Sequence, residues 1–403
     1  MKNVAEIVAQ IIEQVRKEGD AGIRKICERI GDKAPTELSK NEVDAACSRL
    51  SADRKEVIDY AARNIRKFAQ AIHAPLKEVQ VGFENYSAGM RFAPVYRAAC
   101  YVPGGRYPLP STALMTTIPA TVAEVQEVYV IGPQLTDEVI YAGTVGGATR
   151  FFQIGGAQAV AAAAFGTDMV PRADIIAGPG NAFVAEAKRQ LIGTVGIDMI
   201  AGPSEIAVVA DETGNPDLLI ADLLSQAEHD PDAKCYLLVT SDKLANEVKD
   251  LLPKRVNERR STLPDFIDES VANIEIEVTP SVEDCARRSN EIAPEHLLLH
   301  LADAKAKSQL FTNYGALFIG AHATVPYGDY CAGPNHTLPT GGTARFSGGL
   351  TPLTFLRTQT WLDVPKPCAQ LSDFTARFAE IEGLHAHAKA ARLREQSSSA
   401  GVT

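Results

Sequence analysis

Several features that mark other protein classes are scarce or missing in this sequence of 403 residues. No stretch approaches the ~20 consecutive apolar residues that cross a bilayer, so no membrane span is expected. Lysine and arginine never gather in a dense run and the net charge is -10, so neither nucleic acid nor an anionic membrane is an expected partner. Aromatic residues make up only 6% while alanine and glycine are common, a balance typical of tightly packed α/β enzymes.

The number and spacing of the cysteines bear on metal binding and on the redox environment of the protein. There are seven, an odd number, widely scattered and without a CxxC pair. This pattern argues against a zinc site built from cysteines and predicts a reducing, cytoplasmic location. Residues 1–20 carry acidic side chains within an apolar pattern and lack a small-residue cleavage site, which predicts an amphipathic helix rather than a signal peptide.

A dinucleotide fingerprint is missing as well, because no GxGxxG motif follows any predicted strand. A regular alternation is present instead, in which short apolar runs are followed by turns and helical patterns. Such repeated units indicate right-handed crossovers and a parallel sheet. The predicted strands lie at 127–133, 150–156, 173–180, 205–211, 234–240, 273–278, 296–300 and 316–320.

The first hundred residues show a different texture, mostly helical, with apolar positions at helical spacing over 3–17 and 52–72 and Ser51 as an N-cap. The fold class expected for the whole chain is α/β with two sheet domains and a boundary near 205–215. The predicted division is residues 1–100 with 208–350 as one discontinuous α/β domain, residues 101–207 as the second, and residues 351–403 as a C-terminal tail with a helix around 371–393.

Two glycine turns lead from predicted strands into helices: GGAQ at 155–158 and GPGN at 178–181. Such turns can place backbone N–H groups and a helix N-terminus near a pyrophosphate. The same glycines can also serve only to make the turns tight, and both interpretations stay open.

Polar residues cluster in four further segments, each with an ordinary structural alternative. In SQAEHD (225–230), an amide and an imidazole share one side of a helix end and can bind zinc. In APEHLLLH (293–300), an acid and an imidazole open an apolar strand, a position suited to acid–base chemistry. The alternatives are a polar helix terminus and a buried structural histidine.

The other two segments are a glycine- and proline-rich loop, YGDYCAGPNHTLPTGG (327–342), and EGLHAHAKAAR (382–392) on the predicted C-terminal helix. The loop carries Asp329, Asn335 and His336, and the helix carries Glu382, His385 and His387. A surface loop and a solvated helix face are the plain alternatives. Cys331 lies in the loop without a neighbouring base in the sequence, so we expect a packed thiol and not a nucleophile.

Taken together, the wording and order of these segments resemble the histidinol dehydrogenase family. The similarity runs from about residue 3 to 393 and rests on long motifs: YVPGG, PST-LM, GGAQA, GPGNAFVAEAKRQ, DM-AGPSE, DLLSQAEH, APEHL, GDY-AGPNHTLPTGGTARFS and EGL-AH. The resemblance implies two domains with incomplete Rossmann-like parallel sheets and a homodimer with shared active sites, in which the C-terminal tail reaches the partner subunit. It also places NAD on the 101–207 domain, bound weakly and without the usual fingerprint.

The resemblance further implies a role for each matched residue. Tyr101, Gln158 and Asn181 would contact NAD, and Glu295 and His296 would be the catalytic acid–base pair. One zinc ion per site would be held by Gln226, His229, Asp329 and, from the other subunit, His387. The substrate would contact Ser204, His336 and Glu382, together with His296 and the four metal ligands. This mixed nitrogen and oxygen set suits Zn²⁺.

The activity that the resemblance implies is oxidation of L-histidinol to L-histidine through a bound aldehyde, with two NAD⁺ reduced, as in histidine biosynthesis. Arg106 and Tyr107 stand where many members have small residues, and the chain begins later than typical members, so we expect a small dimerising element to be missing. Dehydrogenases of other alcohols, such as sulfonated propanediols, are the alternative within the family. A non-catalytic metal- or nucleotide-binding paralogue and a metallohydrolase are alternatives of other classes.

Overall fold

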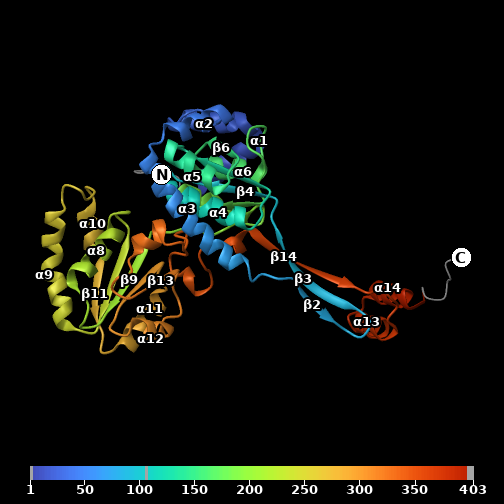
Figure 1. The fold of residues 1–403 in the computed structure, drawn as a ribbon. Helices are drawn as coiled ribbons and strands as arrows, with labels where there is room; N and C mark the ends of the chain where they lie inside the picture. The colour runs from blue at the N-terminus through green and yellow to red at the C-terminus, as the bar shows by residue number, and fades with distance from the viewer. Residues whose placement is uncertain (1–2, 105–107, 397–403) are drawn as a thin grey trace. The chain divides into compact units, whose positions relative to one another are not determined.

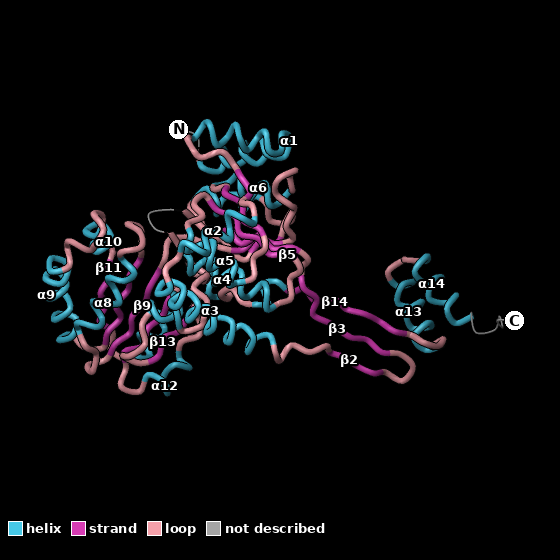
Figure 2. Tube along the Cα trace, turned by 45° about the horizontal axis from the view of Figure 1, so that its top comes forward, coloured by secondary structure: helices cyan, strands magenta, loops and turns pink. Residues whose placement is uncertain are grey.

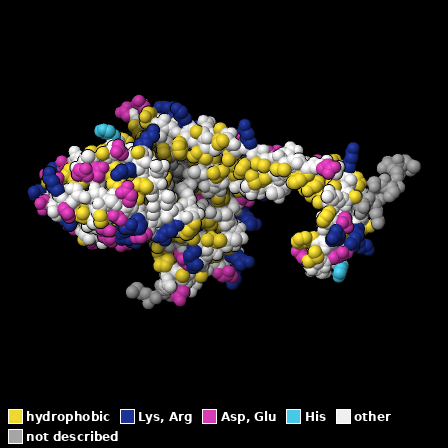
Figure 3. All heavy atoms as spheres, turned by 90° about the horizontal axis from the view of Figure 1, so that it is seen from below, with side chains coloured by type: hydrophobic (Ala, Val, Ile, Leu, Met, Phe, Trp, Pro, Cys, Tyr) yellow, Lys and Arg dark blue, Asp and Glu magenta, His cyan; other side chains and the backbone are white. Residues whose placement is uncertain are grey.

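The computed structural model describes residues 3–104 and 108–396. The internal contacts divide the chain into two units, residues 1–73 with 95–355 and residues 74–94 with 356–403 (Figure 1). Among the helices of the described residues, none is long and apolar enough to cross a membrane. On the face drawn in Figure 3, basic and acidic side chains are interspersed over the described residues.

The first sheet has the strand order β1-β6-β5-β4-β7-β8, in which β1 is antiparallel to β6 and the other neighbours are parallel. Its strands are β1 (Thr36–Glu37), β4 (Arg97–Tyr101), β5 (Glu127–Gly132), β6 (Arg150–Gln153), β7 (Ile175–Ala177) and β8 (Gly196–Ile197). β5 is apolar from Val128 to Ile131 because helices cover both faces of the sheet. The strands predicted near 127, 150 and 173 are confirmed, whereas β1, β4 and β8 lie outside the predicted set.

The helices on the first sheet form two layers. On one face, α4 and α5 pack together with α2 and α3; on the other, α1 packs on α6 and α7, and Figure 2 shows α1 over α6. Their bounds are α1 (Val4–Ile30), α2 (Lys40–Arg49), α3 (Ala52–His73), α4 (Pro110–Val122), α5 (Asp137–Gly146), α6 (Gly156–Phe165) and α7 (Ala182–Gln190). The predicted helices and cap are confirmed, since the N–H of Arg54 donates to the Ser51 hydroxyl at 3.4 Å.

This packing differs from the predicted division of the chain. We expected residues 1–100 to join residues 208–350, but α1, α2 and α3 cover the helices of the first sheet, and β4 is a central strand of that sheet. The cause is the apolar face of α1, whose buried residues include Val8, Ile11 and Val15 and share a core with the alanine-rich α6.

The second sheet is fully parallel, with the order β11-β10-β9-β12-β13. Helices α8, α9 and α10 share the core on one face of this sheet, and α11 and α12 share the core on the other. The strands are β9 (Glu205–Ala210), β10 (Lys234–Val239), β11 (Ile274–Val278), β12 (His296–His300) and β13 (Ala316–Ile319). The helices are α8 (Pro216–Ala227), α9 (Asp242–Glu258), α10 (Ile267–Ala272), α11 (Val282–Ile292) and α12 (Ala304–Lys307). All five strands were predicted, and all five are confirmed.

The second unit joins two distant parts of the chain. The three-stranded antiparallel sheet β14-β3-β2 is formed by β2 (Val79–Gly82), β3 (Ser87–Pro94) and β14 (Leu356–Asp363). Trp361 pairs with Gly89, where a Cβ atom would lie 2.4 Å from the indole ring, so glycine is required. Beyond β14, α13 (Ala369–Ile381) packs on α14 (His385–Gln396). The expected tail at 351–403 is therefore no independent segment, and its single predicted helix is interrupted at Gly383, which has φ 76°.

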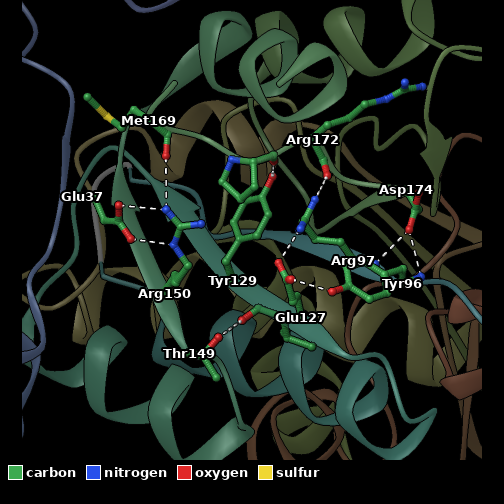
Figure 4. Close-up of polar contacts among 12 residues, drawn as sticks. Glu37, Tyr96, Arg97, Glu127, Tyr129, Thr149, Arg150, Met169, Arg172 and Asp174 are labelled. Carbon is green, nitrogen blue, oxygen red and sulfur yellow. Dashed lines mark hydrogen bonds and ion pairs between the residues drawn. The ribbon is translucent and has the colours of Figure 1, made fainter. Parts of the chain in front are cut away.

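Charged side chains at the amino-terminal edge of the first sheet form ion pairs and hydrogen bonds with one another (Figure 4). Arg97 donates to Glu127 at 2.5 Å, and Arg150 donates to Glu37 at 2.6 Å while its guanidinium lies over the ring of Phe152. The charged side chains at this edge therefore pair with one another. The residues predicted to be functional all lie elsewhere.

Candidate active site

The predicted acid–base pair lies at the amino-terminal end of β12. α11 ends at Ile292 and is capped by Ala293, which adopts a left-handed conformation (φ 51°), and the strand begins three residues later at His296. Glu295 and His296 are 6% and 4% exposed, and 3.8 Å separates the carboxylate Oε2 from the imidazole Nδ1. Two ionisable side chains therefore lie next to each other and are buried from solvent.

The backbone of Glu205, at the start of β9, holds both members of this pair. Its N–H donates to Glu295 Oε2 at 3.0 Å, and its C=O lies 3.2 Å from His296 Nδ1. A carbonyl only accepts hydrogen bonds, so Nδ1 carries the proton in this contact and Nε2 of the neutral ring is left as a base.

Asp329 faces the free nitrogen of His296. It belongs to a short π-helical turn at Tyr327–Cys331, and its Oδ1 lies 3.5 Å from His296 Nε2. The backbone C=O of Asp329 accepts from His336 Nδ1 at 2.9 Å, while the Thr112 hydroxyl of α4 lies 3.3 Å from His336 Nε2. The structure therefore brings Glu295, His296, Asp329 and His336 together, and it adds Thr112, which belongs to the PST-LM motif but was assigned no role from the sequence.

The electrostatics of the cluster follow from its burial. Burial raises the pKa of the Glu295 carboxyl to about 7. For His296, burial alone would lower the pKa, but the carboxylates of Glu295 and Asp329 outweigh it and the pKa is raised. For Asp329, burial alone would raise the pKa, but its contact with His296 and the charges of nearby imidazoles outweigh burial and the pKa is lowered. A carboxyl that titrates near neutrality beside a histidine is the arrangement that proton transfer needs.

Gln226 and His229 lie at the end of α8. Gln226 is 1% exposed, and neither its Oε1 nor its Nε2 has a hydrogen-bond partner among the described residues. His229 is exposed, and its imidazole is among the groups that lower the pKa of Asp329. A buried amide without partners is costly, so such a group points to a ligand.

The predicted metal ligands are divided between the two units. His387 lies on α14 of the second unit, as does the predicted substrate contact Glu382 at the end of α13, and both are exposed. Among the described residues, no group of three His, Cys, Asp or Glu side chains is arranged to hold a metal. The three predicted ligands in the first unit are Gln226, His229 and Asp329. They cannot make up a group of three His, Cys, Asp or Glu side chains, because Gln226 is an amide. The unpartnered Gln226 amide and the Asp329 carboxylate fit the oxygen donors of a mixed zinc site.

The residues predicted to contact NAD lie at the carboxyl-terminal edge of the first sheet. Tyr101 ends β4, and its hydroxyl accepts from the N–H of Gly156 at 3.1 Å; burial raises its pKa to about 12. Gln158, in the first turn of α6, is 1% exposed and its Nε2 lacks a partner among the described residues. Asn181 caps α7 by accepting from the N–H groups of Phe183 and Val184.

Three further predictions concern Ser204, the cysteines, and the pair Arg106 and Tyr107. Ser204 is half-buried directly before β9, and its C=O accepts from Lys234 N–H at 3.0 Å. All seven cysteines are free thiols. Arg106 and Tyr107 lie outside the described residues.

Comparisons with known proteins agree with these motifs. The sequence model of the family described as histidinol dehydrogenase matches residues 1–395. Histidinol dehydrogenase from Methanococcus maripaludis is 37% identical over 98% of this chain and 94% of the relative, and the enzyme of that name from Chlorobium luteolum is 39% identical over 97% and 90%. The crystal structure of histidinol dehydrogenase from Elizabethkingia anophelis has a TM-score of 0.92 and 31% identity, covering 99% of this chain and 94% of that one.

Proposed function

This chain belongs to the histidinol dehydrogenase family, and we propose that it oxidises L-histidinol to L-histidine with NAD⁺ at a zinc site. The overall change is histidinol, water and two NAD⁺ to histidine and two NADH, with protons released. The observation that carries the proposal is the buried Glu295–His296 pair, whose free Nε2 faces Asp329 3.5 Å away.

The first oxidation needs a base for the hydroxyl proton of the alcohol. His296 Nε2 takes that proton, since Nδ1 is engaged by the Glu205 C=O and keeps the ring oriented. NAD⁺, when bound, supplies the hydride acceptor for both oxidations. The aldehyde is retained by the proposed substrate contacts, which include His336, and the hydrogen bond of His336 Nδ1 to the backbone C=O of Asp329 supports that role.

The second oxidation needs a water molecule activated for attack on the aldehyde. Glu295 is the base for this step, because its pKa of about 7 lets it accept a proton near neutrality and release it again. Its position is held by the N–H of Glu205, which donates to the same carboxylate. The two oxidations thus divide between neighbouring side chains, His296 for both proton losses and Glu295 for the water.

Zinc would be held by Gln226, His229 and Asp329 of one subunit and His387 of another, and when bound it supplies orientation of the amino alcohol. The pair of unpartnered amide atoms on Gln226 supports this assignment. A homodimer is proposed with it, because the second unit carries exposed apolar side chains that need cover (Figure 3). On α13 these are Phe374, Phe378 and Ile381, at 59%, 64% and 83% exposure.

The test of the activity is NAD⁺ reduction, followed at 340 nm, with histidinol and a sulfonated propanediol as competing substrates. We expect turnover with histidinol, loss on chelation, and recovery with Zn²⁺ or Mn²⁺. The His229→Ala variant should lose stoichiometric metal, whereas His322→Ala, an exposed histidine near the end of β13, should keep it. Full activity of a demetallated sample, or turnover of the sulfonate alone, contradicts the proposal.

The test of the shared site is subunit mixing. Inactive His387→Ala and His229→Ala chains are combined under conditions that allow exchange. In a symmetric pair with shared sites, a mixed dimer has one intact site and one with both defects. Activity should therefore return on mixing, and verified exchange without recovery contradicts a shared site.

A further inference from the structure

A fully buried ion pair lies beside the turn that is proposed to bind NAD⁺. Lys188 of α7 and Asp198, which follows β8, form a salt bridge, and their side chains are 1% and 0% exposed. The Arg97–Glu127 bridge of the same sheet, by contrast, leaves its side chains 22% and 37% exposed. Moving two charges out of water costs more than their attraction usually returns, so stability alone does not explain a buried pair.

Two further hydrogen bonds of this pair converge on one residue, Gly178. Lys188 Nζ donates to the Gly178 C=O at 2.9 Å, and the Gly178 N–H donates to Asp198 Oδ2 at 2.7 Å. Gly178 has φ 118°, and a Cβ atom there would lie 2.1 Å from the backbone oxygen of Tyr101. Both charged side chains therefore hydrogen-bond to the backbone of the turn that leads to Asn181. The same turn packs closely against the end of β4.

Asp198 also starts a second connection, toward the acid–base pair. Its Oδ1 accepts from the N–H of Met199 at 2.7 Å. Three residues later, the Gly202 N–H donates to the Thr340 hydroxyl at 2.6 Å. The segment then reaches Glu205, whose backbone holds Glu295 and His296.

We propose that Lys188 and Asp198 are positioning residues that align the Gly178 turn with the segment 199–205, and so set the position of NAD⁺ relative to the acid–base pair. The inference rests on the proposed function. Both side chains are buried, so neither is placed to touch a bound ligand directly. Both act through the backbone of Gly178 and Met199, which they contact directly.

The test is the double variant K188M/D198N, which removes both charges together and leaves no uncompensated charge in the core. The matched control is R97M/E127Q, which removes an ion pair from the opposite edge of the same sheet. NAD⁺ affinity is measured by calorimetry, and kcat and KM are measured for each substrate. The thermal midpoint and metal content of each variant report on folding.

We expect K188M/D198N to fold, to keep its metal, and to bind NAD⁺ about tenfold more weakly. Its kcat/KM for NAD⁺ should fall by up to about 100-fold, the effect of a misplacement near 1 Å, while the control keeps wild-type values. A purely structural pair would lower the thermal midpoint and leave NAD⁺ affinity unchanged, and that result overturns the proposal.

Should K188M/D198N not fold, K188Q takes its place, since it removes the cation and keeps both N–H contacts to Asp198. Wild-type NAD⁺ affinity in folded K188Q equally overturns the proposal. If the wild-type protein reduces no NAD⁺ with any alcohol, the proposed function fails. If the wild-type protein is active and the variants match it, only the positioning role fails.

Discussion

The parallel strands of the two large sheets in the first unit have the same order, and the proposed function uses opposite ends of the two sheets. Numbered along the chain, the parallel strands run 3-2-1-4-5 in each sheet, as β6-β5-β4-β7-β8 and as β11-β10-β9-β12-β13. In such a sheet the helices change faces between strands 1 and 4, and a crevice forms there at the carboxyl ends of the strands. Identical topology therefore offers the same crevice twice.

In the first sheet this switch point lies between β4 and β7, and glycines form the turns beside it. Gly156 and Gly178 have positive φ values, 67° and 118°, and bring the turns close to Tyr101. The buried amide of Gln158 there has an unpartnered Nε2 among the described residues. This edge is the one proposed to receive NAD⁺.

In the second sheet the corresponding crevice, between β9 and β12, is filled by side chains. Asp211 accepts from the N–H groups of Thr213 and Ala302, at 3.0 and 2.9 Å, and so links the ends of both strands. His300 contacts Asp222 at 3.1 Å, and Asp222 accepts from Thr324 at 2.7 Å. The proposed acid–base pair instead lies at the amino end of β12, so under the proposed function the side chains, and not the topology, decide which edge is used.

The largest expected effect contrasts the two ends of β12. Glu295→Gln should slow the aldehyde step by about 10²–10⁴-fold, because the amide cannot accept a proton from water. His300→Asn, at the other end of the strand, should lower stability and leave the chemistry unchanged. Single-turnover rates for alcohol and aldehyde separate the steps, and equal losses in both variants would contradict the contrast.

The same carboxyl predicts a pH dependence. Since burial raises the Glu295 pKa to about 7, the ionised base is lost as pH falls through that value. The wild-type aldehyde step should therefore slow below about pH 7, and Glu295→Gln should lose the part of this decline that Glu295 contributes, leaving only the part due to His296. A wild-type rate that is flat between pH 6 and 8, roughly the range of this titration, would show that Glu295 is not the base.

A smaller effect tests the glycine crevice of the first sheet. Gly178→Ala places a Cβ atom against the Tyr101 backbone, so NAD⁺ affinity should fall about tenfold or more through displacement of the turn. Gly193→Ala is the matched control, because Gly193 has φ 89° and open space around the added atom. It should cost about 1–2 kcal/mol in stability and no affinity. Equal NAD⁺ affinity in both variants would remove the turn from the cofactor site.

The smallest effect concerns the filled crevice of the second sheet. Asp211→Asn should lower the free energy of unfolding by about 1–3 kcal/mol and leave NAD⁺ affinity unchanged. Burial alone would raise the Asp211 pKa, but the hydrogen bonds from Thr213 and Ala302 outweigh it and the pKa is lowered. The carboxylate therefore contributes stability above its unfolded pKa, and this contribution is lost as pH falls through the lower folded value. Denaturation at neutral and acid pH measures it, and a wild-type-like variant would show that the crevice is closed by other groups.

Strands with long apolar runs and helices with clear periodicity were predictable from the sequence, because those signals depend on residues a few positions apart. The predicted strands near β5, β6 and β7 and all five strands of the second sheet are in place. The family was also evident, since motifs such as APEHL and DLLSQAEH keep functional residues together in the chain. β4 was not predicted because its sequence, RAACY, is short and the residues before it show no clear hydrophobic periodicity.

The sequence by itself determined the alternation of strands and helices, the family, and the identities of Glu295, His296 and Asp329 as candidates. Only the tertiary structure decided that β14 pairs with β3, that Glu205 orients the acid–base pair through its backbone, and that Lys188 and Asp198 meet beneath Gly178. The physical reason is range. Periodicity and turns are local, whereas register, burial and ion pairing are settled when segments far apart in the chain compete for the same contacts.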